Sequence, residues 1–204
     1  IIVASSGRSG STILYNSLKN SNVNSNIPII RSFEKRLMSG NSWDLDKDKL
    51  INGVIYKTHA LAHELKPESN VKVIFIFGSA VDSVMSVLNC KEKYGEEWIK
   101  LHMKHLRVKE DFKLIKNEDI LRIKDQIIGW RGKKNVERLI IKYNSLWKYE
   151  KEISKFIGFK LNLIPRRERI DYSLKKPEVY KKVKKNYKEI ETFIENLPEL
   201  EILD

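Results

Sequence analysis

Short apolar runs alternate with amphipathic stretches along the first 160 or so residues. Runs rich in β-branched and aromatic side chains predict four buried strands, at residues 1–5, 54–56, 71–77 and 139–142. Apolar residues at helical spacing predict helices after three of these runs, at about 12–18, 81–88 and 145–157. Alternation of strand and helix favours a parallel sheet covered on both faces. We therefore expect an α/β fold with three layers, α/β/α, around a central parallel sheet.

The remaining stretches are helical in pattern and interrupt this alternation without a linker. Residues 96–129 are charged and carry apolar side chains at turn-like spacing, and residues 177–197 form an amphipathic tail. No internal repeat or low-complexity segment separates two parts of the chain. We expect one domain over residues 1–204, with a helical insert at about residues 90–132.

Composition adds a strong positive charge to an otherwise ordinary globular chain. Of 204 residues, 41% are hydrophobic and 32% charged, which is typical of a soluble domain, but the formal net charge is +12. Such a surplus attracts polyanions, including nucleic acid, acidic glycans, membrane surfaces and nucleotide phosphates. The lysine-rich run at 181–185 fits either a solvated helix face or a partner-binding surface, and charge alone leaves both open.

Cysteine and histidine usage argues against several classes of site. Cys90 is the single cysteine, which excludes an internal disulfide and a multi-cysteine metal site and favours a cytoplasmic setting. His102 and His105 could share a helix face, but no third ligand lies near them in the sequence, so we expect no metal. No apolar run reaches roughly 18 residues, and we expect no membrane span.

A glycine- and serine-rich segment follows the first predicted strand and opens a helix. Backbone N–H groups and the positive end of the helix dipole then point at one spot, which suits a phosphate. The segment combines close-approach glycines, hydroxyl donors and a guanidinium: Gly7, Arg8, Ser9, Gly10, Ser11 and Thr12. The pattern predicts a phosphate-binding P-loop after the first strand; a turn without a ligand is the alternative.

The loop departs from that of nucleoside triphosphatases and kinases. Ser5 stands where their pattern has its first glycine, and Ser11 takes the place of their lysine. The strand at 71–77 ends in Gly78 and Ser79, without the carboxylate that would hold Mg²⁺. A P-loop nucleotide kinase therefore stays as an alternative interpretation only.

The run Arg-Ser-Gly-Ser-Thr at 8–12 resembles the 5′-phosphosulfate loop of sulfotransferases that use 3′-phosphoadenosine-5′-phosphosulfate (PAPS). The run Lys57-Thr58-His59, at the end of the second predicted strand, is similar to the Lys-Thr-His of that family, which carries its catalytic histidine. The resemblance implies PAPS as donor, its product PAP (adenosine 3′,5′-bisphosphate) and no metal.

Sulfuryl transfer needs a base for the acceptor proton and cations for charge on the leaving oxygen. His59 suits the base because the pKa of histidine lies near neutrality, and Arg8 and Lys57 suit the cations. A loop histidine without a catalytic role is the alternative for His59.

Residues 78–86 are similar to the family pattern Arg-Asn-Pro-Lys-Asp-x-x-x-Ser, whose Arg and Ser hold the 3′-phosphate of PAPS. Asp82 and Ser86 fall into register with it, whereas Gly78 stands in place of the Arg. Three alternatives follow: another basic residue reaches that phosphate, the donor binds weakly, or the donor differs.

Two later segments complete the resemblance. The strand at 139–142 followed by Tyr143 is similar to the family's strand and Tyr-Glu-Asp-Leu, which implies that Tyr143 lies near the adenine. A core aromatic is the alternative. The basic run at 166–169 resembles a phosphate-contacting loop of the family, with a solvated loop as the alternative.

The leading interpretation is a sulfotransferase that moves the sulfuryl group of PAPS to a hydroxyl or amine acceptor by in-line transfer. A catalytically impaired relative that binds PAP, PAPS or polyanions is the main alternative. We expect residues 27–50, with Trp43, and the insert at 90–132 to form the acceptor pocket and lid. The expected acceptor is a small molecule or glycan, and the basic surface favours an acidic one; we expect neither a nucleic-acid nor a membrane partner.

Overall fold

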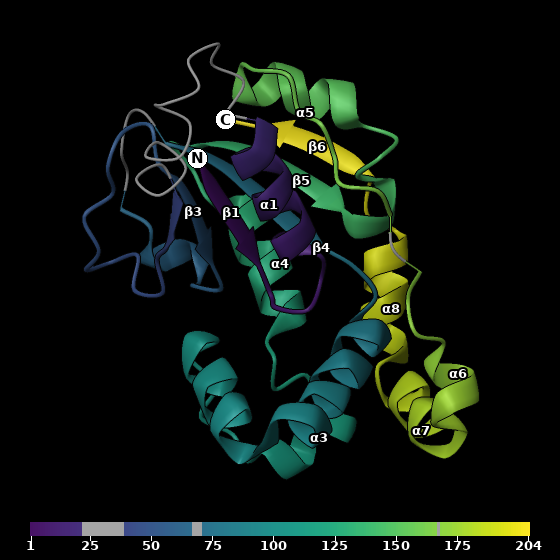
Figure 1. Ribbon diagram of the computed structural model, residues 1–204. Helices are drawn as coiled ribbons and strands as arrows, with labels where there is room; N and C mark the ends of the chain where they lie inside the picture. The colour runs from purple at the N-terminus through teal and green to yellow at the C-terminus, as the bar shows by residue number, and fades with distance from the viewer. Residues whose placement is uncertain (22–38, 67–70, 167) are drawn as a thin grey trace.

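The chain folds around a six-stranded sheet (Figure 1). The computed structural model describes residues 1–21, 39–66, 71–166 and 168–204. The strand order is β2-β3-β1-β4-β5-β6, in which the first five strands are parallel and β6 is antiparallel to β5. The strands are β1 (Ile2–Ser5), β2 (Ser39–Asn41), β3 (Ile55–Thr58), β4 (Lys72–Phe77), β5 (Glu137–Lys142) and β6 (Leu200–Leu203).

Side chains of the central strands alternate between two buried cores, so the sheet is covered on both faces. Helices α1 and α5 cover one face, and α3, α4, α7 and α8 cover the other. The helices are α1 (Ser11–Ser21), α3 (Ala80–His105), α4 (Ile123–Gly132), α5 (Glu150–Ile157), α6 (Tyr172–Lys175), α7 (Pro177–Asn186) and α8 (Lys188–Glu195). Short 3₁₀ helices cover Ala62–Glu64, Phe112–Lys116 and Tyr143–Ser145.

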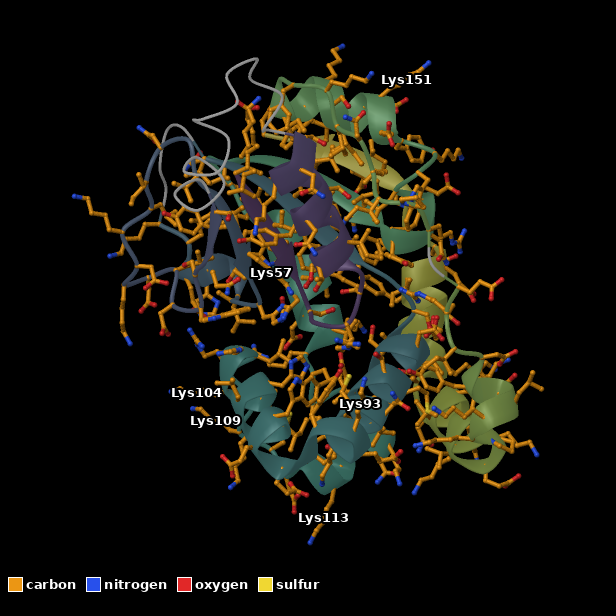
Figure 2. The ribbon with its side chains drawn as sticks, in the orientation of Figure 1. Lys57, Lys93, Lys104, Lys109, Lys113 and Lys151 are labelled. Carbon is orange, nitrogen blue, oxygen red and sulfur yellow. The ribbon has the colours of Figure 1, made fainter. Side chains whose placement is uncertain are left out.

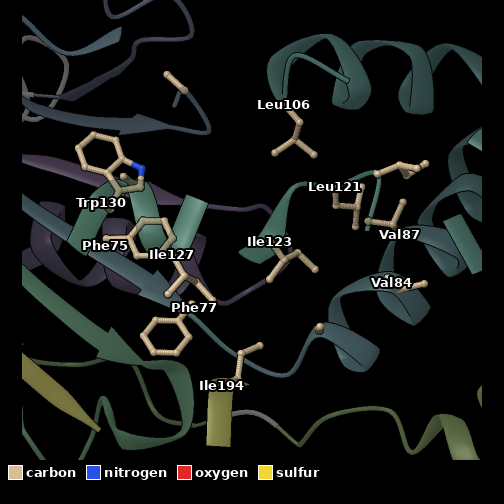
Figure 3. Packing of buried hydrophobic residues seen from close by; sticks show 14 of the residues in the cluster. Phe75, Phe77, Val84, Val87, Leu106, Leu121, Ile123, Ile127, Trp130 and Ile194 are labelled. Carbon is tan, nitrogen blue, oxygen red and sulfur yellow. The ribbon is translucent and has the colours of Figure 1, made fainter. Parts of the chain in front are cut away.

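The larger core lies between β4 and α4 (Figure 3). Phe75 and Phe77 project from β4 toward Ile127 and Trp130 of α4, and the rings of Phe75 and Trp130 lie 6.1 Å apart. Trp130 is fully buried, and truncating such an aromatic typically costs about 3–5 kcal/mol. The C-terminal part of the segment predicted as an insert is therefore a helix of the central core.

Helix α3 bends sharply at Gly95, whose φ of 81° and ψ of −171° are not helical. Glycine tolerates this backbone geometry because it has no Cβ. The bend turns the second half of α3 back below the carboxyl ends of the strands, and Figure 1 shows the two halves meeting at an angle there. None of the described helices is long and apolar enough to cross a membrane.

The predicted three-layer α/β architecture, with a loop and helix directly after the first strand, is confirmed. Two edge strands were not predicted, because β2 is a three-residue Ser-Gly-Asn segment and β6 has only four residues. The predicted tail helix is split into α7 and α8 at Tyr187, and the helix expected at 145–157 begins only at Glu150.

Candidate functional site

The carboxyl ends of β1, β3, β4 and β5 border a cavity of about 460 Å³. This edge is where open parallel sheets bind ligands, because loops and helix N-termini converge there. Most of the predicted site residues line the cavity: Arg8, Gly10, Ser11, Thr12, Lys57, His59, Ser86 and Tyr143. The structure thus brings together side chains from four separate segments of the chain.

The loop between β1 and α1 depends on its glycines. Gly7 and Gly10 have φ angles of 82° and 88°, and Arg8 has a φ of 54°. A Cβ atom placed on Gly10 would lie 2.0 Å from Cδ2 of Tyr143, which no side chain could accommodate. The loop therefore passes directly under the Tyr143 ring and leaves the first N–H groups of α1 facing the cavity edge.

Several hydroxyl groups in and beside the loop are hydrogen-bonded within the protein. Ser5 Oγ donates to Ser11 Oγ at 2.9 Å. Ser9 Oγ lies 3.3 Å from the carbonyl oxygens of Gly7 and of Ile76 in β4, so the hydroxyl of this predicted phosphate-binding residue is hydrogen-bonded within the protein. Of the predicted loop residues, Gly7 and Ser9 are not among those lining the cavity.

His59, immediately after β3, is fixed in one tautomer by Ser5. His59 Nδ1 lies 3.0 Å from the carbonyl oxygen of Ser5 and 3.2 Å from Ser5 Oγ, whose proton goes to Ser11. The carbonyl oxygen can only accept, so Nδ1 carries the hydrogen that binds it and Nε2 keeps a lone pair. Burial, and then electrostatic repulsion from the protonated form of His102 and from Lys57, hold the pKa of His59 well below its ordinary 6.5. His59 is therefore a neutral base at neutral pH.

Two cations flank the loop. Lys57 Nζ donates to Thr12 Oγ1 at 2.8 Å, and burial followed by the Arg8 charge lowers the pKa of Lys57 below 10.5. Arg8 Nε donates to Ser86 Oγ at 2.9 Å, which joins the loop to the first turns of α3. Figure 2 shows Lys57 between the sheet and α3, whereas Lys104 and Lys113 project outward from the molecule.

A second guanidinium reaches the cavity from the segment before α6. Arg169 lies with Cζ 3.9 Å from the centre of the Tyr143 ring and donates from Nη1 to Asp82 Oδ2 at 2.9 Å. Arg166 instead donates to Asn144, and Arg167, the remaining arginine of the predicted basic run, lies outside the described residues. Within the basic run, the sequence pattern does not distinguish Arg169 from its neighbours, because its contacts are with residues more than 25 positions away.

The second half of α3 forms the opposite wall of the cavity. It contributes Trp98, Leu101, His102 and His105. These residues lie within the segment at 90–132 that was expected to form the acceptor pocket, but none of them was predicted individually as a site residue. The ring of Trp98 stacks on His102 at 4.8 Å. Trp43 stacks on His105 at 4.2 Å and lies 5.2 Å from His59.

Part of the predicted acceptor region, residues 27–38, lies outside the described residues. In the part of the chain that the structure describes, no group of three or more His, Cys, Asp or Glu side chains is arranged to hold a metal ion.

Buried His102 makes the stability of the protein sensitive to acid. Burial, and then the charge of Arg8, lowers the pKa of His102 to about 4. Between pH 6.5 and 4 the unfolded chain therefore binds a proton that the folded chain does not, and stability falls as pH falls. Asp119, whose pKa burial raises to about 6, opposes this trend over part of the range.

We expect the His102→Gln variant to abolish this difference of one bound proton between the unfolded and the folded chain. The parent should lose about 1.4 kcal/mol more than the variant in unfolding free energy for each pH unit within that window. Urea unfolding at several pH values measures the difference. The matched variant His63→Gln, at an exposed position, should keep the parental slope.

No protein-family model matches this chain, and no curated protein matches its sequence. Its structure is similar to that of mouse sulfotransferase SULT7A1 complexed with PAP, with 14% identity and a TM-score of 0.47 over 93% of this chain and 64% of that one. It is also similar to retinol dehydratase in complex with androsterone and the inactive cofactor PAP, with 14% identity and a TM-score of 0.44 over 92% and 65%. The chain therefore spans less than two thirds of the length of both proteins.

Proposed function

We propose that this chain is a PAPS-dependent sulfotransferase that transfers the sulfuryl group to a hydroxyl or amine acceptor. The observation that carries the proposal is the placement of a glycine-dependent P-loop, Lys57 and a neutral His59 around one cavity. The loop supports a phosphate ligand, and the basic histidine beside it supports removal of an acceptor proton.

The polar groups around the loop fit a phosphosulfate. Ser6 Oγ and His102 Nε2 are buried and have no hydrogen-bond partner in the described ranges, and Gly7 lies next to both. Buried donors of this kind are costly unless a ligand pairs with them. We infer that backbone N–H groups between Arg8 and Thr12 hold the 5′-phosphosulfate, because the N–H of Gly7 already donates to Ser5 Oγ.

Gly78 stands where the family has the arginine that holds the 3′-phosphate. The position of Arg169 supports the alternative in which another basic residue reaches that phosphate. Its guanidinium lies beside Asp82, four residues before Ser86, and Arg8 already contacts Ser86. We assign Ser86 and Arg169 to the 3′-phosphate, because a hydroxyl and a guanidinium group match its oxygen acceptors, and Arg8 to the leaving phosphate. Tyr143 would lie beside the nucleotide, and the family resemblance implies a place near the adenine.

PAPS supplies an activated sulfuryl group whose leaving group is a phosphate. His59 accepts the acceptor proton at Nε2, since Nδ1 is committed to Ser5. Lys57 Nζ, held at the mouth of the loop by Thr12, stabilises the negative charge that develops on the leaving phosphate, together with Arg8. Ser5 thereby acts as a positioning residue for His59.

The wall opposite the loop supports an acceptor with an apolar or planar part. Trp98 and Leu101 offer apolar surface, and His105 with Lys57 offers polar and cationic groups. We propose a small-molecule or glycan acceptor, and the cationic cavity favours one that carries negative charge. A buried, unpaired Cys90 is compatible with the cytoplasmic setting that we propose.

A direct test is transfer of radiolabelled sulfate from PAPS to a panel of phenols, alcohols, amines and acidic sugars. We expect labelled product with at least one acceptor. PAP binding without any transfer would favour the impaired relative, and absence of both transfer and PAP binding would contradict the proposal.

Arg169→Ala should weaken PAP binding by at least about tenfold, because a charge-assisted contact to a phosphate is lost. Adenosine 5′-phosphosulfate, which lacks the 3′-phosphate, should bind the variant and the parent alike. Calorimetric titration measures both affinities. Arg122→Ala, which removes an arginine paired with Asp125 away from the cavity, is the matched control. An equal loss for both nucleotides would contradict the assignment of Arg169.

A further inference from the structure

A buried imidazole lies in the wall of the cavity that α3 forms. His102 lies in the second half of α3, seven residues after the bend at Gly95, and is 7% exposed. It lines the cavity, and its Nε2 atom is buried without a hydrogen-bond partner among the residues that the structure describes. A polar atom in this condition points to a group that binds there.

His102 packs against the phosphate loop. A Cβ atom placed on Gly7 would lie 2.8 Å from Cε1 and 3.2 Å from Nε2 of His102, so the imidazole packs on the bare backbone of the loop. On its other side the ring stacks on Trp98, at 4.8 Å and an interplanar angle of 14°. The loop and the tryptophan thus hold the ring in one orientation.

The position relative to His59 shows which end of the ligand His102 faces. The two imidazoles meet edge to face, with centroids 5.8 Å apart. Since His59 is the base for the acceptor, His102 lies beside the reacting end of a donor in the loop. Ser86 and Arg169, which bind Arg8 and Asp82, are the residues that we assign to the 3′-phosphate.

Burial also decides the chemical state of His102. With a pKa of about 4 the ring is neutral at pH 7 and carries one hydrogen. A neutral N–H can donate to an anionic oxygen without adding a full charge to a site that already holds Lys57 and Arg8.

We propose that His102 is a sulfuryl-contacting residue whose Nε2–H donates to an oxygen of the sulfuryl group of PAPS. The contact joins the second half of α3 to the loaded loop and is absent when PAP, which has no sulfuryl group, occupies the same loop. His102 therefore makes the protein bind donor in preference to product. This inference rests on the proposed function of the cavity.

The test compares the affinities of the His102→Phe variant for PAPS and for PAP, by calorimetric titration without acceptor. Phenylalanine keeps a planar ring against Trp98 and Gly7 but removes the donor. We expect PAPS to bind at least about tenfold more weakly than to the parent and PAP to bind within about twofold of it. Equal losses for both nucleotides, or no loss for either, would overturn the proposal.

Two further variants distinguish the loss of a hydrogen-bond donor from a folding defect. His102→Gln retains an amide donor and should recover a substantial part of the PAPS affinity, whereas His63→Phe changes an exposed histidine and should match the parent. If glutamine fails to restore PAPS binding while thermal unfolding is unchanged, the donor role is wrong. If the parent binds PAP but has no preference for PAPS, this inference alone fails; if it binds neither, the proposed function fails with it.

Discussion

Replacing His59 by alanine should lower the rate of sulfuryl transfer by about 10²–10⁴-fold, the usual contribution of a positioned general base. The reason is geometric: Nδ1 of His59 is hydrogen-bonded to the Ser5 carbonyl, which leaves the Nε2 lone pair available in a residue that lines the cavity. The PAP affinity should stay within about twofold of the parent, because no phosphate contact is assigned to this ring. Steady-state rates with labelled PAPS and calorimetry with PAP measure the two quantities.

His63→Ala provides the matched control for His59, since it removes an exposed histidine four residues along the chain. It should leave both rate and affinity unchanged. A His59 variant that retains more than about a tenth of the parental rate would contradict the assignment of this residue as the base. Loss of PAP binding together with rate would indicate a structural role instead.

Gly10→Ala should have the largest effect on the loop. Gly10 has a φ of 88°, which costs a side-chain-bearing residue about 1–2 kcal/mol, and its new Cβ would collide with the Tyr143 ring at 2.0 Å. Overpacking adds about 1–3 kcal/mol more. We therefore expect a loss of roughly 2–5 kcal/mol in unfolding free energy and loss of measurable PAP binding, because the loop or the ring must move.

Gly53→Ala separates the collision from the backbone strain. Gly53 has a similar φ of 80°, but a Cβ there would meet nothing within 4 Å. It should cost only about 1–2 kcal/mol in urea unfolding and leave PAP binding intact. Equal losses in the two variants would show that contact between Gly10 and Tyr143 does not shape the loop.

The features predicted correctly from sequence are those set by neighbours in the chain. The loop at 5–12 combines glycines, hydroxyls and a strand before it, and both its place and its glycine requirement follow from local backbone geometry. The position of His59 at the end of β3 follows from strand pattern in the same way. Edge strands β2 and β6 carry too short a pattern, and their pairing depends on residues far along the chain.

The features that were missed depend on long-range packing. Arg169 was predicted only as one member of the basic run at 166–169, and its contacts with Tyr143 and Asp82 arise because the chain returns to the cavity before α6. His102 reaches Gly7 because α3 bends at Gly95, and a single glycine in a helical pattern does not specify the direction of a bend. In the sequence, His102 and His105 suggested only a weak metal pair, whereas the structure directs them to the cavity.

We propose that the cavity at the carboxyl ends of the strands binds the PAPS nucleotide. Calorimetric titration of the parent protein with PAP, and separately with Mg·ATP, tests it most directly, because neither experiment requires the acceptor. We predict one PAP per chain, bound more tightly than Mg·ATP, since the loop lacks the triphosphatase lysine and β4 ends without a Mg²⁺-binding carboxylate. No heat of binding with PAP, or tighter binding of Mg·ATP, would contradict the account.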